Sequence, residues 1–155
     1  MRRRPQPQDA VPVRVSLEGE AQVTSVRVLG FDPASSERLV VTVPIRTVSE
    51  ANAHEHWRHR QKRAKGQRAT TARVILSAFG VGRLAGIASS VVTLTRIAPR
   101  ALDGDNCVGA MKHCRDGAAD AMGIKDNDPR VSWQYDQRRG GPKEYAVEIA
   151  IQVRA

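Results

Sequence analysis

Six of the nine aspartates of this 155-residue chain, and none of its glutamates, fall between Asp103 and Asp128. The segment opens with Asp103-Gly104-Asp105-Asn106 and closes with Asp126-Asn127-Asp128, whereas the whole chain carries a formal net charge of +9. Carboxylates are the hard oxygen ligands that Mg²⁺ and Mn²⁺ prefer, and a basic body attracts a polyanion. The pattern therefore indicates a divalent metal site that faces nucleic acid.

A helix is predicted inside this acidic segment, from about Cys107 to Met122. A strand from Val91 to Ile97 precedes it, and Pro99 ends that strand. At about 100° per residue, the helix has an apolar stripe on one face and a polar stripe on the opposite face. The apolar stripe comprises Cys107, Met111, Cys114, Ala118 and Met122, and the polar stripe comprises Gly109, Lys112, Asp116 and Asp120.

Several of these polar residues also suit ordinary structural roles. Lys112 and Asp116 have the i, i+4 spacing of a helical ion pair, and Asp105 or Asn106 suits an N-cap. Asx residues before a proline suit a turn. These roles do not explain the second acidic group, Asp126-Asn127-Asp128. It follows the predicted helix directly, where the chain must turn back toward that helix. We expect Asp120 to be solvated.

A second helix is predicted from about Ser49 to Phe79, and its first half is strongly basic. Six basic residues and no acidic one lie between Arg58 and Arg68, which favours phosphate contact over a plain solvated face. These residues are Arg58, Arg60, Lys62, Arg63, Lys65 and Arg68. A second basic group for DNA contact lies in the turn before the last strand, at Arg138, Arg139 and Lys143.

Three histidines near the basic helix do not predict a metal site. They have no thiolate beside them, and their spacing does not place all three on one helical face. They are His54, His56 and His59. We expect them to add polar contacts beside the basic run.

Alternating apolar residues predict strands on both sides of these helices. The clearest are 11–17, 39–45, 131–135 and 145–153, with a weaker one at 23–28. Residues 139–143 predict a hairpin between the last two strands. The fold class is therefore α+β, with a mixed, mostly antiparallel sheet and two principal helices. We expect a disordered basic arm at 1–10 and a single domain at 11–155.

The composition indicates a cytoplasmic protein without a membrane span. No apolar run approaches the roughly 18 residues that a span requires, and the arginines at 2–4 are followed by proline and glutamine. Cys107 and Cys114 would lie about 10 Å apart on one helix, too far for a disulfide. We expect both to be core thiols.

At the acidic segment the sequence resembles the RusA-like Holliday junction resolvases, which are common in phages and prophages. The resemblance is carried by Asp103-Gly104-Asp105-Asn106, by Lys112 with Asp116 four residues later, and by Asp126 or Asp128 before a strand. A stretch with Asn52, Trp57 and Arg58 is similar to the family's segment ahead of its first helix. The similarity covers roughly residues 45–153. Lys112 lies about three residues farther along than in the family, and the family's adjacent Asp-Asp pair is split by Asn127.

This resemblance implies a homodimeric endonuclease that cuts four-way DNA junctions with Mg²⁺ (or Mn²⁺), from a phage or prophage in a bacterial host. The implied metal ligands are Asp103 and Asp105 with Asp126 or Asp128. Lys112 would stabilise charge in the reaction, and Asp116 would orient Lys112.

Two other functions remain open. A non-catalytic nucleic-acid-binding accessory protein would use the same acids only to cap and balance a basic domain. A small-molecule metalloenzyme would need a lined apolar pocket, which a chain with two Phe, two Tyr and two Trp does not favour.

Overall fold

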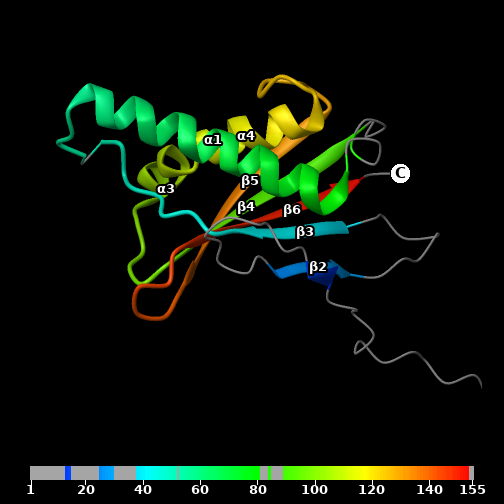
Figure 1. Ribbon diagram of the computed structural model, residues 1–155, viewed down its shortest axis with the longest axis horizontal. Coiled ribbons are helices and arrows are strands. Elements are labelled where there is room, and N and C mark those ends of the chain that lie inside the picture. Colours follow the sequence, from blue (N-terminus) through cyan, green and yellow to red (C-terminus); the bar gives the residue numbers. More distant parts are fainter. Residues whose placement is uncertain are drawn as a thin grey trace, which may run out of the picture.

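The protein folds as one mixed β-sheet with its helices over one face (Figure 1). The computed structural model describes residues 13–14, 25–29, 38–51, 53–80, 84 and 89–153. The predicted arm at 1–10 and Asn52 lie outside the described residues. The strands are β1 Val13–Arg14, β2 Ser25–Leu29, β3 Arg38–Val43, β4 Ser90–Ala98, β5 Val131–Arg139 and β6 Ala146–Val153.

The strand order in the sheet is β1-β2-β3-β6-β4-β5. Four neighbouring pairs are antiparallel, and only β4 and β5 run parallel. The prediction of an α+β fold with a mixed, mostly antiparallel sheet is confirmed. The central strands β4 and β6 supply buried Leu94 and Ile149 to the core.

The predicted hairpin between β5 and β6 is wrong. β6 pairs with β3 and β4, and β5 lies beyond β4, so the connection crosses the end of β4. There the amide of Gly140 donates to the carbonyl of Ala98 at 2.9 Å. The burial patterns give the reason: β5 alternates half-buried and exposed residues, as suits an edge, whereas β6 is largely buried, as suits the interior of a sheet.

Above this sheet lie the helices α1 Trp57–Phe79, α3 Gly104–Ala110 and α4 Lys112–Met122. The first begins at Trp57 rather than Ser49. The predicted 107–122 helix starts earlier, at Gly104, and is interrupted at Met111, whose ψ of 3° leaves helical geometry. Gly123 ends α4 in a left-handed conformation with φ 67°.

The predicted apolar stripe forms the core contact of α3 and α4. All five of its residues are buried. Both cysteines are free and buried, as predicted, and burial raises the pKa of the Cys114 thiol to about 11. Among the described helices none is both long enough and apolar enough to cross a bilayer.

Helices α1 and α4 pack closely at Gly117. A Cβ built there would lie 2.3 Å from the carbonyl oxygen of Arg68 and 2.9 Å from Cβ of Thr71.

We expect Gly117→Ala to force the helices apart and to lower the free energy of unfolding by about 1–3 kcal/mol, measured by urea denaturation. The control is Gly66→Ala in α1, where an added Cβ meets no atom within 4 Å. That change should stabilise the protein by up to about 1 kcal/mol, and equal losses in both variants would contradict the packing assigned to Gly117.

Candidate functional site

The turn that carries Asp103 and Asp105 is fixed by two side chains from the sheet. The amide group of Gln137 on β5 accepts from the Leu102 amide at 2.9 Å and donates to the Leu102 carbonyl at 2.7 Å. Arg96 on β4 is 6% exposed and donates to the Arg100 carbonyl at 2.8 Å. Both aspartates remain exposed at the start of α3. The backbone around them is therefore held in place while their carboxylates stay accessible.

A chain of hydrogen bonds joins this turn to the segment before α1. Ser49 Oγ donates to Asn106 Oδ1 at 2.9 Å, and Asn106 Nδ2 lies 3.4 Å from Asp103 Oδ2. The two stretches that carried the sequence resemblance, 57 residues apart at this bond, are therefore neighbours in space. Sequence reasoning missed the positioning roles of Ser49, Arg96 and Gln137, because each acts through a partner distant in the chain.

A hollow lined by arginines lies beside the turn. It has a volume of about 370 Å³ and is formed by Pro99, Arg100, Ala101, Gln137, Arg138 and Arg139. Two of the predicted DNA-contact residues thus lie next to the Asp103 turn, and Arg138 also approaches Glu148 at 3.6 Å. Lys143 lies in the following loop with a φ of 59° and is not among the lining residues. Arg100, Arg138 and Arg139 contribute to this lining, and a guanidinium group can bind two phosphate oxygens at once.

A second, polar hollow lies along α4 and the loop after it. Its volume is about 580 Å³, and its lining includes Lys112, Asp116 and Asp126. Of the predicted polar stripe, Lys112 and Asp120 are exposed, whereas Gly109 and Asp116 are partly buried. Lys112 and Asp116 share this hollow, but the described residues include no ion pair between them; Asp116 instead lies 4.0 Å from Arg115. The orienting role of Asp116 stays a prediction.

Asp126 and Asp128 differ in their surroundings. Asp126 accepts from Arg115 at 2.7 Å, and its side chain is 46% exposed. Asp128 accepts from the backbone and the guanidinium of Arg130, and these hydrogen bonds lower its pKa to about 2. Its side chain is only 14% exposed. Asp128 therefore makes more hydrogen bonds than Asp126 and is less exposed. Asp126 lines the same hollow as Lys112.

The structure places the two acidic groups at opposite ends of the β4–β5 pair. Asp103 follows the end of β4, and Asp126 and Asp128 precede the start of β5. Since the strands are parallel and in register from Ser90–Val131 to Ala98–Arg139, these ends are separated by the length of the pair, about 26 Å. Figure 1 shows α3 at one end and the loop after α4 at the other. Accordingly, no group of three or more His, Cys, Asp or Glu in the described residues could hold a metal ion.

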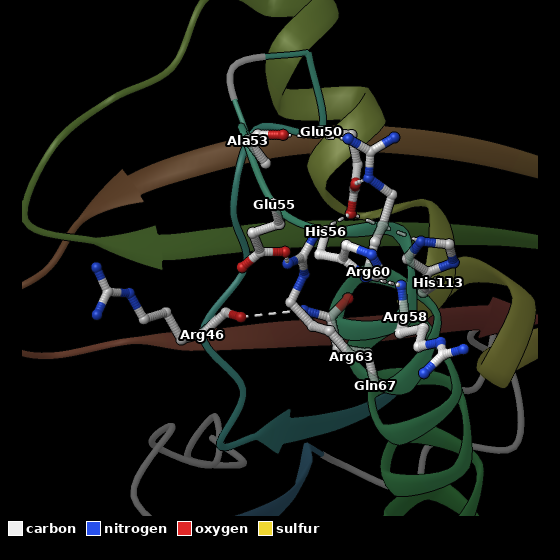
Figure 2. Close-up of polar contacts among 10 residues, drawn as sticks. All are labelled: Arg46, Glu50, Ala53, Glu55, His56, Arg58, Arg60, Arg63, Gln67 and His113. Atoms are coloured by element: carbon white, nitrogen blue, oxygen red, sulfur yellow. Dashed lines mark hydrogen bonds and ion pairs between the residues drawn. The ribbon is translucent and has the colours of Figure 1, made fainter.

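Half of the predicted basic run on α1 is neutralised by acids from elsewhere in the chain. Glu50 contacts Arg63 at 2.8 Å, Arg60 at 3.6 Å and His113 of α4 at 3.7 Å, as Figure 2 shows. Arg63 also binds Glu55. Farther along, Arg68 Nη2 donates to Asp120 at 2.8 Å, which lowers the pKa of Asp120. Asp120, expected only to be solvated, is thus half of an exposed ion pair.

The other three cations, Arg58, Lys62 and Lys65, form a separate row on α1. They are spaced at i, i+4 and i+7 and are all exposed. At about 100° per residue, Arg58 points roughly 160° away from Arg60 and about 140° away from Arg63, so this row faces away from the two arginines that bind Glu50. No described acid forms an ion pair with these three residues. They are the part of the basic run that remains available to phosphate.

No protein-family model matches the chain, and the comparison with curated proteins finds no match either. What the site does must therefore follow from its own geometry and charge.

Proposed function

We propose that this protein is a metal-dependent endonuclease that cuts branched DNA at four-way junctions and acts as a homodimer. The observation that supports this most is the Asp103–Asp105 turn. Gln137 holds the backbone of this turn, Asn106 contacts Asp103, both carboxylates are exposed, and the turn lies beside a hollow lined by three arginines. Carboxylates next to phosphate-binding groups suit metal-assisted phosphodiester hydrolysis. The resemblance of this segment to the RusA-like resolvases points to the same reaction.

The proposed metal is Mg²⁺ or Mn²⁺, held by Asp103, Asp105 and an aspartate of the loop that contains Asp126 and Asp128. These hard oxygen ligands fit such an ion in chemistry, but one chain alone does not bring them together. When bound, the metal would supply a water of lowered pKa and would neutralise charge on the phosphate. Lys112 would stabilise charge on the leaving oxygen, and Asp116 would help to position Lys112.

A second copy of the chain can bring the two acidic groups together. β5 is the last strand at one edge of the sheet, and an edge strand can pair with another chain. If two β5 strands pair antiparallel about a two-fold axis, the start of each lies beside the end of the other. The partner's Asp126 and Asp128 would then approach Asp103 and Asp105. The dimer would contain two such shared sites, which matches a junction with paired strands.

DNA contact is proposed for the cations that the protein leaves without acid partners. Among the described residues these are Arg58, Lys62 and Lys65 on α1, together with Arg100 and Arg139 beside the Asp103 turn. Contacts of this type position the backbone and carry little sequence information. We infer recognition by the shape of the DNA rather than by its sequence.

The decisive experiment uses a labelled synthetic four-way junction and a linear duplex of the same length, each with and without Mg²⁺. We expect paired nicks at symmetric positions in the junction only when Mg²⁺ is present. Tight binding without nicking under all metal conditions would instead favour the non-catalytic binding protein. Equal nicking of the duplex would remove the junction preference from the proposal.

The salt dependence of junction binding can distinguish the two faces of α1. Lys62→Gln and Arg60→Gln each remove one positive charge, but Arg60 is paired with Glu50, whereas Lys62 has no ion pair with a described acid. We expect Lys62→Gln to weaken metal-free junction binding and to reduce the slope of log K against log salt by about 0.9, and Arg60→Gln to leave the slope unchanged. Fluorescence anisotropy over a salt series measures both. Equal slopes for the two variants would contradict the division into two faces.

A further inference from the structure

The first residue of α1 is a tryptophan that the protein leaves uncovered. The Trp57 side chain is 57% exposed, and with Val108 it makes up the exposed large hydrophobic residues of the described chain. The other tryptophan, Trp133, is partly buried, packs against the core, and donates its indole N–H to the Asp126 carbonyl at 2.9 Å. Trp57 contributes little to the core, so folding alone does not explain its position.

The surroundings of Trp57 are aromatic and cationic. The guanidinium carbon of Arg58 lies 5.4 Å from the centre of the indole ring. The ring of His56 lies 5.9 Å from it at an interplanar angle of 34°, and His59 stands edge-on to His56 at 6.4 Å. The nearest acid in the sequence, Glu55, is bound by Arg63. The tip of α1 therefore presents a flat ring bordered by the charge of Arg58, and the described residues place no unpaired carboxylate beside it.

We propose that Trp57 is a stacking platform for an unpaired base of a DNA strand whose phosphates lie along Arg58, Lys62 and Lys65. Single-strand sites combine an aromatic ring with a row of cations, because each base has a π-face and each nucleotide a phosphate. An apolar protein partner would have to cover these unpaired cations, which is unfavourable, so the charge favours nucleic acid. This inference rests on the proposed function, since a branch point is where a junction exposes bases without full pairing.

The test uses the fluorescence of the two tryptophans, Trp57 and Trp133. In Trp133→Phe protein the emission comes from Trp57 alone, and in Trp57→Phe protein it comes from Trp133 alone. Without added metal, we expect oligothymidylate to quench the Trp57 emission strongly and to leave the Trp133 emission nearly unchanged. A fully paired duplex of equal length should quench Trp57 much less. By anisotropy, Trp57→Ala should bind oligothymidylate about five- to a hundredfold more weakly, and Trp57→Phe should recover part of the loss.

Each contrary result has a definite meaning. Equal quenching by duplex and single strand, or unchanged affinity in Trp57→Ala, would overturn the stacking role. A Trp57 emission that ignores DNA but changes with protein concentration would also overturn it, because a second copy would then cover the ring. None of these measurements requires cleavage. If oligothymidylate quenches the Trp57 emission but the protein never nicks a junction with Mg²⁺, the nuclease proposal would be overturned. The stacking role of Trp57 would then still be supported.

Discussion

Asp105→Asn is expected to abolish Mg²⁺-dependent nicking of a four-way junction while junction binding stays as tight as in the wild type or becomes tighter. The amide keeps the size of the side chain but loses the charge that holds the metal and repels phosphate. A metal that contributes several kcal/mol to the reaction corresponds to a loss of about a thousandfold or more in rate. Single-turnover cleavage and metal-free anisotropy measure the two quantities separately.

The matched control is Asp120→Asn. Asp120 lies on the polar face of α4 but is paired with Arg68, and it has no part in the proposed chemistry. This variant should lose an exposed ion pair worth at most about 1 kcal/mol and should cleave at the wild-type rate. Wild-type cleavage by Asp105→Asn would show that the Asp103 turn does not hold the metal.

The second large effect is expected from mixing two inactive proteins. Asp105→Asn lacks a ligand in the turn, and the double variant Asp126→Asn/Asp128→Asn lacks both candidates in the loop. If each site is shared between copies, a mixed dimer contains one site with both defects and one intact site. Random exchange of equal amounts makes half of the dimers mixed, so nicking should return to about a quarter of the wild-type level. The restored product should be single nicks rather than paired cuts, as resolved on denaturing gels.

A control mixture distinguishes this result from other causes. Asp103→Asn mixed with Asp105→Asn should stay inactive, because every site then lacks one ligand of the turn. If all ligands came from one chain, the first mixture would stay inactive as well. A native mass measurement on the same samples establishes whether mixed dimers have formed, so that a silent mixture can be read as evidence against a shared site.

The sequence predicted where the strands lie along the chain better than it predicted which strands pair with each other in the sheet. Alternation located β5 and β6, because period-two apolar residues reflect a face that must be buried. It did not show that β5 pairs with β4, since pairing depends on contacts between segments far apart in the chain.

The same limit applied to the candidate site. Asp103 and Asp105 could be singled out from the sequence because their spacing and turn are local. The neutralisation of Arg60 and Arg63 could not be predicted, because Glu50 reaches them only after the preceding segment folds back along α1 (Figure 2). The separation of the two acidic groups likewise follows from the parallel pairing of β4 and β5, which no local pattern indicates.

The close contact at Gly117 has a consequence for how DNA would lie in the proposed complex. It joins α1 to α4 at Arg68, and the same residue is bound to Asp120. The stretch of α1 from Trp57 to Arg68 is therefore a rigid spacer about 17 Å long. A base stacked on Trp57 would accordingly stay at a fixed distance from the hollow that Arg68 and Lys112 line.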